Sequence, residues 1–186
     1  MGKKTKKKAR RRPAKLDIEV LPFRIIVDTR EQHPYRFDCH VVGHGKKQRS
    51  LYVRTIRGGL ATGDYSIEGM GHLVSVERKS LADAYGTFGH GRDRWIRELE
   101  RLERLRVAVV VVEADWASVR AFRRPASSRG RRFTPEAFEA SVTAWQQRYQ
   151  GVHWEFCSTR LLAEERTLRH LTRFWRDAVE QAKQSS

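Results

Sequence analysis

The hydrophobic pattern begins with short apolar runs that are too brief for helices. Residues 23–27 (FRIIV) are rich in β-branched side chains, end at Asp28 and predict a buried strand. Residues 35–39 and 51–56 predict two further strands on either side of a polar, basic loop. Residues 107–112 (VAVVVV) form an unbroken apolar run that is typical of a strand covered on both faces. Residues 152–157 predict a last strand.

Helical spacing separates these runs. Ser80 opens a predicted helix, and apolar residues keep helical spacing to about Arg106, with glycines breaking its first part. Asp115 is expected to cap a helix that starts at Trp116, and Thr134 followed by proline is a second start signal. An apolar stripe over residues 161–181 predicts a last helix. We therefore expect an α/β protein with a central mixed sheet flanked by helices.

Residues 64–68 and 73–77 both alternate and predict a hairpin. If residues whose numbers sum to 141 face one another, Tyr65 meets Val76 on one face, while Asp64 meets Glu77 on the other. A slip of one residue would mix apolar with acidic side chains, so this register is favoured. Lys79 lies two residues beyond Glu77 and therefore on the same face. Two carboxylates and a lysine are expected to converge.

Opposed carboxylates at about 5 Å repel unless a cation lies between them. Mg²⁺ prefers carboxylate oxygens and keeps waters, one of which can attack a phosphodiester, while a lysine can orient that water. The alternative is that Asp64 and Glu77 are solvated residues of an exposed sheet face, with Lys79 as an ordinary ion-pair partner. Asp83 also fits a capping box with Ser80, so its role can be purely structural.

Charge changes the picture, because 38 Lys and Arg against 22 Asp and Glu give a formal net charge of +16 over 186 residues. Residues 1–16 carry nine of these basic residues and no acid, so we expect a disordered arm over residues 1–20, a folded domain over 21–181 and a tail over 182–186. An arginine-rich loop ends at Arg132. A polyanion is the expected partner.

Several classes are excluded by the sequence. No apolar run is long enough for a membrane span, and no apolar region follows the basic start as in a secretory signal. Cys39 and Cys157 lie too far apart for a C-x-x-C zinc motif or a disulfide framework. We expect an intracellular protein, in the cytoplasm or nucleoid, or in the nucleus of a eukaryote.

Three ordered blocks carry a resemblance: VDTRE at residues 27–31, GDY at 63–65 and VERKSLAD at 76–83. Together they resemble the GD…ERKxxxD signature of the XPF-type (ERCC4-domain) nuclease domain, a branch of the PD-(D/E)XK restriction-like superfamily. The likeness covers roughly residues 21–178. It implies a restriction-endonuclease-like α/β fold.

The resemblance also implies a site, position by position. Asp64 and Glu77 would hold Mg²⁺ or Mn²⁺, Asp28 would complete the acidic cluster, and Lys79 would serve the attacking water. Other residues would face phosphate, tie the site together or support the motif, and these are Arg30, Arg78, Asp83 and Arg92.

The implied activity is a metal-dependent endonuclease that cuts one strand of DNA near a junction with single-stranded DNA, such as a flap or fork, in repair or recombination. A nucleic-acid-binding module that has lost turnover and positions a partner protein stays open, as does a basic RNA-binding protein. Family members commonly continue into helix-hairpin-helix repeats, for which this chain has no room. Phosphate affinity is instead expected from Lys6, Lys7, Lys8, Arg10, Arg11, Arg12, Arg129, Arg131 and Arg132, or from a partner protein. The last apolar stripe is compatible with a homodimer.

Overall fold

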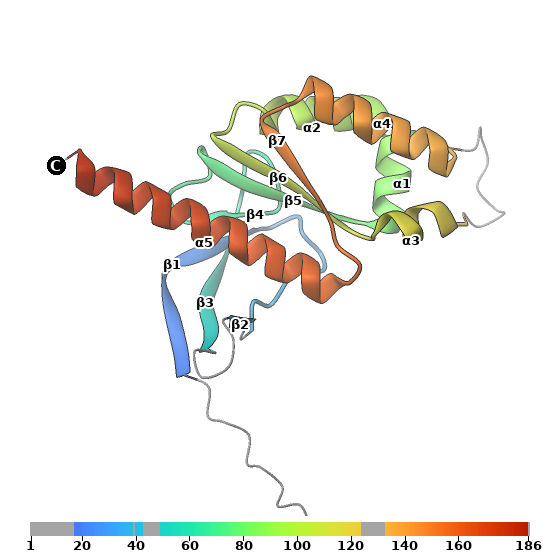
Figure 1. Ribbon diagram of the computed structural model, residues 1–186. Coiled ribbons are helices and arrows are strands. Elements are labelled where there is room, and N and C mark those ends of the chain that lie inside the picture. The colour runs from blue at the N-terminus through green and yellow to red at the C-terminus, as the bar shows by residue number, and fades with distance from the viewer. Residues whose placement is uncertain (1–16, 39, 43–48, 124–132, 186) are drawn as a thin grey trace, which may run out of the picture.

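The computed structural model describes residues 17–38, 40–42, 49–123 and 133–185. Within these ranges a seven-stranded mixed sheet has the order β2-β3-β1-β4-β5-β6-β7, with helices on both faces (Figure 1). The strands are β1 (Asp17–Asp28), β2 (His40–Val42), β3 (Arg49–Gly58), β4 (Tyr65–Ile67), β5 (Val74–Ser80), β6 (Val107–Glu113) and β7 (Val152–Phe156). The helices are α1 (Leu81–Gly89), α2 (Arg92–Leu102), α3 (Trp116–Ala121), α4 (Pro135–Arg148) and α5 (Arg160–Gln184). The predicted fold class is confirmed.

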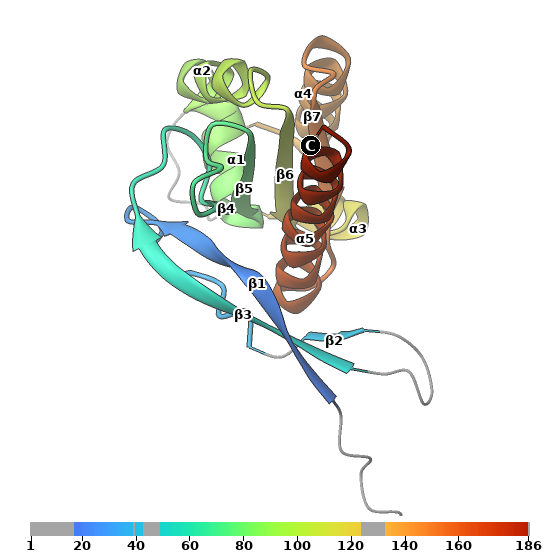
Figure 2. The same ribbon diagram turned by 90° about the vertical axis from the view of Figure 1, so that its left-hand side faces the viewer.

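Strand β6 shows why two hydrophobic cores form. Its alternate residues Val109 and Val111 face α5 together with apolar side chains of β1, β4 and β5. The intervening Val110 and Val112 face the opposite core, which α1, α2, α3 and α4 cover. Because successive side chains of a strand point to opposite faces, an uninterrupted apolar run is what a doubly covered strand requires. Figure 2 shows α5 and α1 on opposite sides of the sheet.

The predicted register of the hairpin is confirmed at its one paired position. Tyr65 on β4 pairs with Val76 on the antiparallel β5, and the backbone N–H of Asp64 donates to the carbonyl of Val76 at 2.9 Å. Strand β1 adds to the other side of β4, where the N–H of Asp28 donates to the carbonyl of Asp64 at 2.8 Å. The backbones of two predicted acidic residues are therefore joined directly.

The helix boundaries follow the expected capping residues. Ser80, Asp115 and Thr134 are the N-caps of α1, α3 and α4, and each side chain accepts a hydrogen bond from a backbone N–H of its helix. Residues 90 and 91 separate α1 from α2, so the glycine-rich stretch does break the predicted helix. No helix in the described ranges is long and apolar enough to cross a membrane.

The strand predicted over residues 35–39 is wrong for its described part. Tyr35 and Phe37 are buried as an alternating strand would have them, but their N–H groups donate to side chains, the hydroxyl of Tyr65 at 2.9 Å and the carboxylate of Glu164 at 2.5 Å. Phe37 also has a positive φ of 54°, which an extended strand does not allow. These side-chain acceptors take the place of the backbone carbonyls that a neighbouring strand would supply.

Two expected boundaries also differ. Strand β1 begins at Asp17 rather than Phe23, because its first residues pair in parallel with β3 and Glu19 forms an ion pair with Arg49 at 2.6 Å. Helix α5 continues to Gln184, beyond its predicted end at about residue 181. The cationic residues predicted to bind nucleic acid lie outside the described residues, and these are Lys6, Lys7, Lys8, Arg10, Arg11, Arg12, Arg129, Arg131 and Arg132.

Candidate active site

A hollow of about 880 Å³ opens where β5 passes into α1, and α2 forms one of its walls. Asp64, Glu77 and Lys79 all line it, so the three residues that the hairpin pattern singled out are brought together. Three of the predicted supporting residues, Arg30, Arg78 and Asp83, line it as well. Among the predicted site residues, Asp28 and Arg92 are absent from its lining.

Lys79 lies against both a carboxylate and an aromatic ring. Its Nζ donates to Oε1 of Glu77, two residues earlier on the same face of β5, and lies 5.2 Å from the centre of the Trp95 ring. The negative face of an indole ring attracts a cation. Trp95, which is fully buried on α2, therefore helps to hold the ammonium group in the hollow.

The electrostatics of the site favour an additional cation. Burial and the charge of Glu77 raise the pKa of Asp64 to about 8, although a hydrogen bond from the Arg78 N–H opposes the shift. Burial alone would lower the pKa of Lys79, but the charge and hydrogen bond of Glu77 and the charge of Asp64 hold it above its ordinary value. Two carboxylates compete here for one ammonium group, so a divalent cation would relieve their repulsion.

The turn before Asp64 is built around a glycine. Gly63 has a φ of 75°, and a Cβ there would lie 2.1 Å from Oγ of Ser75. Glu98 on α2 accepts hydrogen bonds from the Thr62 hydroxyl and from the Gly63 N–H, the latter at 3.1 Å. No other residue fits this turn without moving Ser75, which explains the glycine of the GD motif in physical terms.

Asp28 is fully engaged in a loop contact. Its carboxylate accepts from the N–H, Nε and a terminal nitrogen of Arg30 at 2.8, 2.7 and 3.1 Å, and from the N–H of Leu60 at 2.7 Å. Burial would raise its pKa, but these hydrogen bonds lower it. Each carboxylate oxygen of Asp28 thus accepts two hydrogen bonds. These bonds tie the end of β1 to the loop that leads to Asp64.

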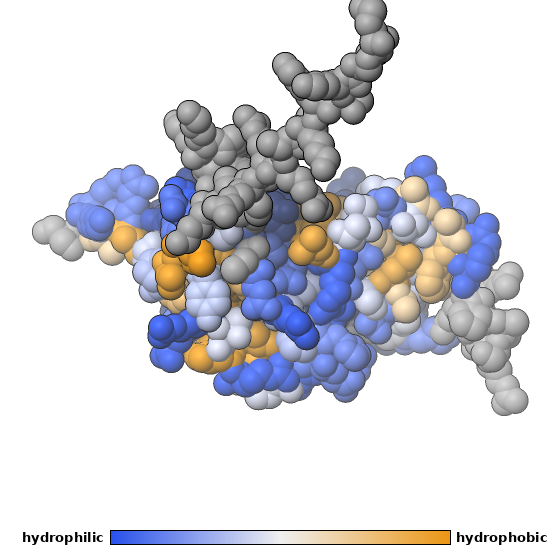
Figure 3. All heavy atoms as spheres, turned by 90° about the horizontal axis from the view of Figure 1, so that it is seen from below, coloured by the Kyte–Doolittle hydropathy of each residue, from blue (hydrophilic) through white to orange (hydrophobic). Residues whose placement is uncertain are grey.

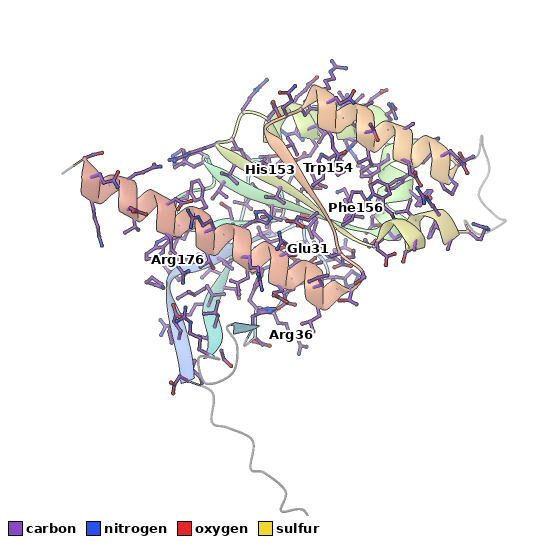
Figure 4. The ribbon with its side chains drawn as sticks, viewed as in Figure 1. Glu31, Arg36, His153, Trp154, Phe156 and Arg176 are labelled. Carbon is purple, nitrogen blue, oxygen red and sulfur yellow. The ribbon has the colours of Figure 1, made fainter. Side chains whose placement is uncertain are left out.

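Arg78 is buried between two carboxylates. Its guanidinium donates to both oxygens of Glu113 at 2.8 and 3.0 Å. It also donates to Glu31 at 3.3 Å. Figure 4 labels Glu31 near the centre of the molecule. Its side chain is 9% exposed. Of the two roles expected for Arg78, these contacts favour the one that ties the site together.

The remaining predicted residues divide between the site and the fold. Asp83 is exposed and accepts from the Ser80 hydroxyl at 2.6 Å, while its own N–H donates back to that oxygen at 3.2 Å, so Asp83 supports the N-cap of α1 at the rim of the hollow. Arg92 instead donates to Ser141 on α4 at 2.8 Å and lies over the ring of Trp145. It is a packing residue.

Sequence reasoning missed several lining residues. Arg94, Glu98 and Arg101 of α2 recur at helical spacing and share one face, which lines the hollow. Glu31 also lines it and is buried. The spacing along α2 was visible in the sequence, but a charged helix face is usually solvated, so only the packing of α2 against the turn at Gly63 identifies it.

Comparisons with known proteins bear on the family and the fold of this chain. The family model described as ERCC4 domain matches residues 27–165. A solved structure of XPF from Aeropyrum pernix has a TM-score of 0.51 and 22% identity, covering 81% of this chain and 60% of that one. The complex of XPF from Aeropyrum pernix with DNA has a TM-score of 0.53 and 20% identity, covering 84% and 66%. The chain thus spans less than two thirds of either structure, and no curated protein matches it.

At this identity the structural likeness shows the fold alone, and the sheet with its flanking helices is the one that the three sequence blocks implied. The family match is independent of that likeness and covers every strand from the end of β1 to β7. The chain belongs to the ERCC4 domain family, the family of XPF-type nuclease domains.

Proposed function

We propose that this protein is a divalent-metal-dependent endonuclease that hydrolyses a phosphodiester bond of DNA. The observation that carries the proposal is the convergence of Asp64, Glu77 and Lys79 in one hollow. Arg30, Arg94 and Arg101 line the same hollow. Arg30 and Arg101 are paired with Asp28 and Glu98, so Arg94 would attract the phosphates of a nucleic acid most directly. A basic chain with this arrangement has the groups that phosphodiester hydrolysis needs.

Asp64 and Glu77 are the residues that would hold the metal. Among the residues with assigned positions, no group of three or more His, Cys, Asp or Glu is placed to bind an ion unaided. Mg²⁺ is commonly held by one or two carboxylates, with waters and substrate phosphate completing its shell, so the pair fits Mg²⁺ or Mn²⁺. When bound, the ion would supply Lewis-acid activation of water and phosphate.

The protein side chains would do the rest. Lys79 stays protonated beside Glu77 and would neutralise charge that develops on the phosphate or orient the attacking water. Asp28, held by Arg30 and Leu60, would keep the loop before Asp64 in place rather than bind the metal. Arg78 and Glu113 would fix the course of β5 behind the site.

DNA is the proposed substrate, with preference for a junction between duplex and single-stranded DNA and a role in repair or recombination. The family match supports this class, as does the similarity to an XPF structure in complex with DNA. The cationic arm and loop outside the described residues would add sequence-blind, salt-sensitive affinity. A homodimer and a partner protein that supplies specificity stay predictions, which light scattering with and without DNA would check.

The test is cleavage of labelled single-stranded, duplex, flap and forked DNA by the purified chain with Mg²⁺, Mn²⁺ or EDTA. Metal-dependent cutting that favours flap or fork supports the proposal and ranks the substrates. Binding of every substrate without cutting, in either metal, would overturn it for this chain and favour the non-catalytic module instead. Cutting of RNA in place of DNA would favour the RNA-directed alternative.

A further inference from the structure

Three hollows in the surface are joined through residues that they share. The second, of about 640 Å³, shares Gln32, His33 and Arg78 with the catalytic hollow and also includes Arg160 from α5. The third, of about 330 Å³, shares Arg36 with the second. The three hollows are therefore neighbours, in a row that leads from the catalytic residues along residues 32–36 to β3.

The segment that lines this row of hollows is anchored from below. Tyr35 stacks on Tyr65 with ring centres 5.0 Å apart, and the N–H of Phe37 is held by Glu164. Arg36 between these buried residues and Asp38 after them are exposed, and Figure 4 shows Arg36 beside β2. The path is thus fixed before any ligand binds, which lowers the entropic cost of binding.

An aromatic and cationic surface lies at the far end. Tyr52 on β3 is 38% exposed and is paired in register with the exposed Val20 of β1. Arg54 follows on the same face and, like Tyr52, lines the third hollow. The side chains of Arg36 and Arg54 make no hydrogen bond or ion pair within the described ranges, whereas that of Arg24 is neutralised by Glu68 at 2.6 Å.

This surface has the composition of a single-strand binding site. Arginine side chains bind phosphates, and an exposed aromatic ring stacks on a base only if that base is unpaired. Figure 3 shows the molecule from below, with hydrophobic patches set among hydrophilic residues. One acid, Asp38, lies among the lining residues of the third hollow and would weaken the attraction.

We propose that a single-stranded segment of the DNA substrate leaves the catalytic hollow along residues 32–36 and reaches the outer face of β1 and β3. There a base stacks on Tyr52, and the flanking phosphates bind Arg36 and Arg54. The identity of the occupant rests on the proposed function, but the path itself rests on the shared hollows and on their side chains.

The test is binding of a fluorescein-labelled single-stranded oligonucleotide by the full chain in EDTA, followed by anisotropy over a salt series. Tyr52→Ala should weaken binding roughly 5-fold or more at an unchanged salt slope, and Tyr52→Phe should restore it, since stacking needs only the ring. Arg36→Ala with Arg54→Ala should reduce the salt slope by about 1.4, because each phosphate contact on a single strand contributes about 0.7. Asp38→Asn should strengthen binding.

The control is Arg97→Ala with Arg104→Ala, an equal change of charge at two exposed arginines that line none of the three hollows. If both arginine pairs weaken binding equally, or if Tyr52→Ala binds like wild type, the path is overturned. If the variants instead lose duplex binding alone, the single-strand assignment fails. Cleavage by wild type in Mg²⁺ is scored separately, so the path can fail while the nuclease stands, or the reverse.

Discussion

The backbone N–H of Arg78 donates to Oδ2 of Asp64 at 2.8 Å, so the residue that follows one acidic candidate holds the carboxylate of the other. The side chain of the same arginine is fixed by Glu113 and Glu31. The separation of Asp64 and Glu77 therefore depends on a buried ion-pair network as well as on the hairpin. Separate substitutions can remove each of these hydrogen bonds and ion pairs.

Asp64 should make the metal-free protein less stable as pH rises. Its pKa is raised from 3.8 to about 8 in the folded state, so the folded protein holds this proton more tightly than the unfolded chain. Stability is then lost as pH increases from about 4 through about 8. Asp64→Asn should flatten this part of the curve when thermal unfolding in EDTA is followed from pH 5 to pH 9. Parallel curves for the two proteins would contradict the assignment.

Asp28→Asn should show whether Asp28 positions the loop before Asp64 or binds the metal. An amide nitrogen cannot accept the hydrogen bond from the Leu60 N–H or from Arg30, so a loss of about 1–3 kcal/mol in unfolding free energy is expected. The increase in unfolding temperature on adding Mg²⁺ should persist in this variant and vanish in Asp64→Asn. If Asp28→Asn also abolishes the increase, Asp28 is a metal ligand after all.

Gly63→Ala should destabilise the protein more than Gly69→Ala. Both glycines have positive φ, 75° and 78°, but only at Gly63 would a Cβ meet Ser75, whereas nothing lies within 4 Å of one at Gly69. The backbone strain alone costs about 1–2 kcal/mol, so the difference between the two variants measures the crowding. Chemical denaturation gives both values. Equal losses would show that the turn before Asp64 is looser than the geometry indicates.

Arg78→Ala should cost about 3–5 kcal/mol, because it leaves the buried Glu31 without its cationic partner and removes the two hydrogen bonds to Glu113, which keeps its ion pair with Arg160. Arg78→Lys should recover only part of the loss, since an ammonium group cannot donate to both oxygens of Glu113 in the same way. Arg120→Ala, which removes an exposed ion pair with Glu139, is the matched control and should leave the unfolding midpoint close to that of wild type.

Sequence reasoning reached the hairpin because its two constraints agree: alternation selects the register, and a one-residue slip would bury acids. The same reasoning could not separate Asp28 from the other acids, since the donors that occupy it, Arg30 and Leu60, meet it only after the loop folds. Glu98 was missed for a related reason, because its partner Gly63 is distant in sequence.

The segment at Tyr35 shows the opposite limit. Its alternation of buried and exposed residues is real, and it predicts a strand, but the donors of its backbone find side-chain acceptors from β4 and α5. Alternation reports which side of a segment is covered and does not report what its backbone binds. The charges that line the second and third hollows could be found only once this segment was placed.

The most direct measurement of the central claim is Mg²⁺-dependent cleavage of a labelled flap by wild type, Asp64→Asn, Glu77→Gln and Lys79→Met, with folding of each checked by circular dichroism. We expect cutting by wild type that stops in EDTA, and losses of at least about 100-fold in all three variants, with Arg92→Gln near wild type because Arg92 packs on α4. Cleavage that survives in folded Asp64→Asn or Lys79→Met would contradict the account.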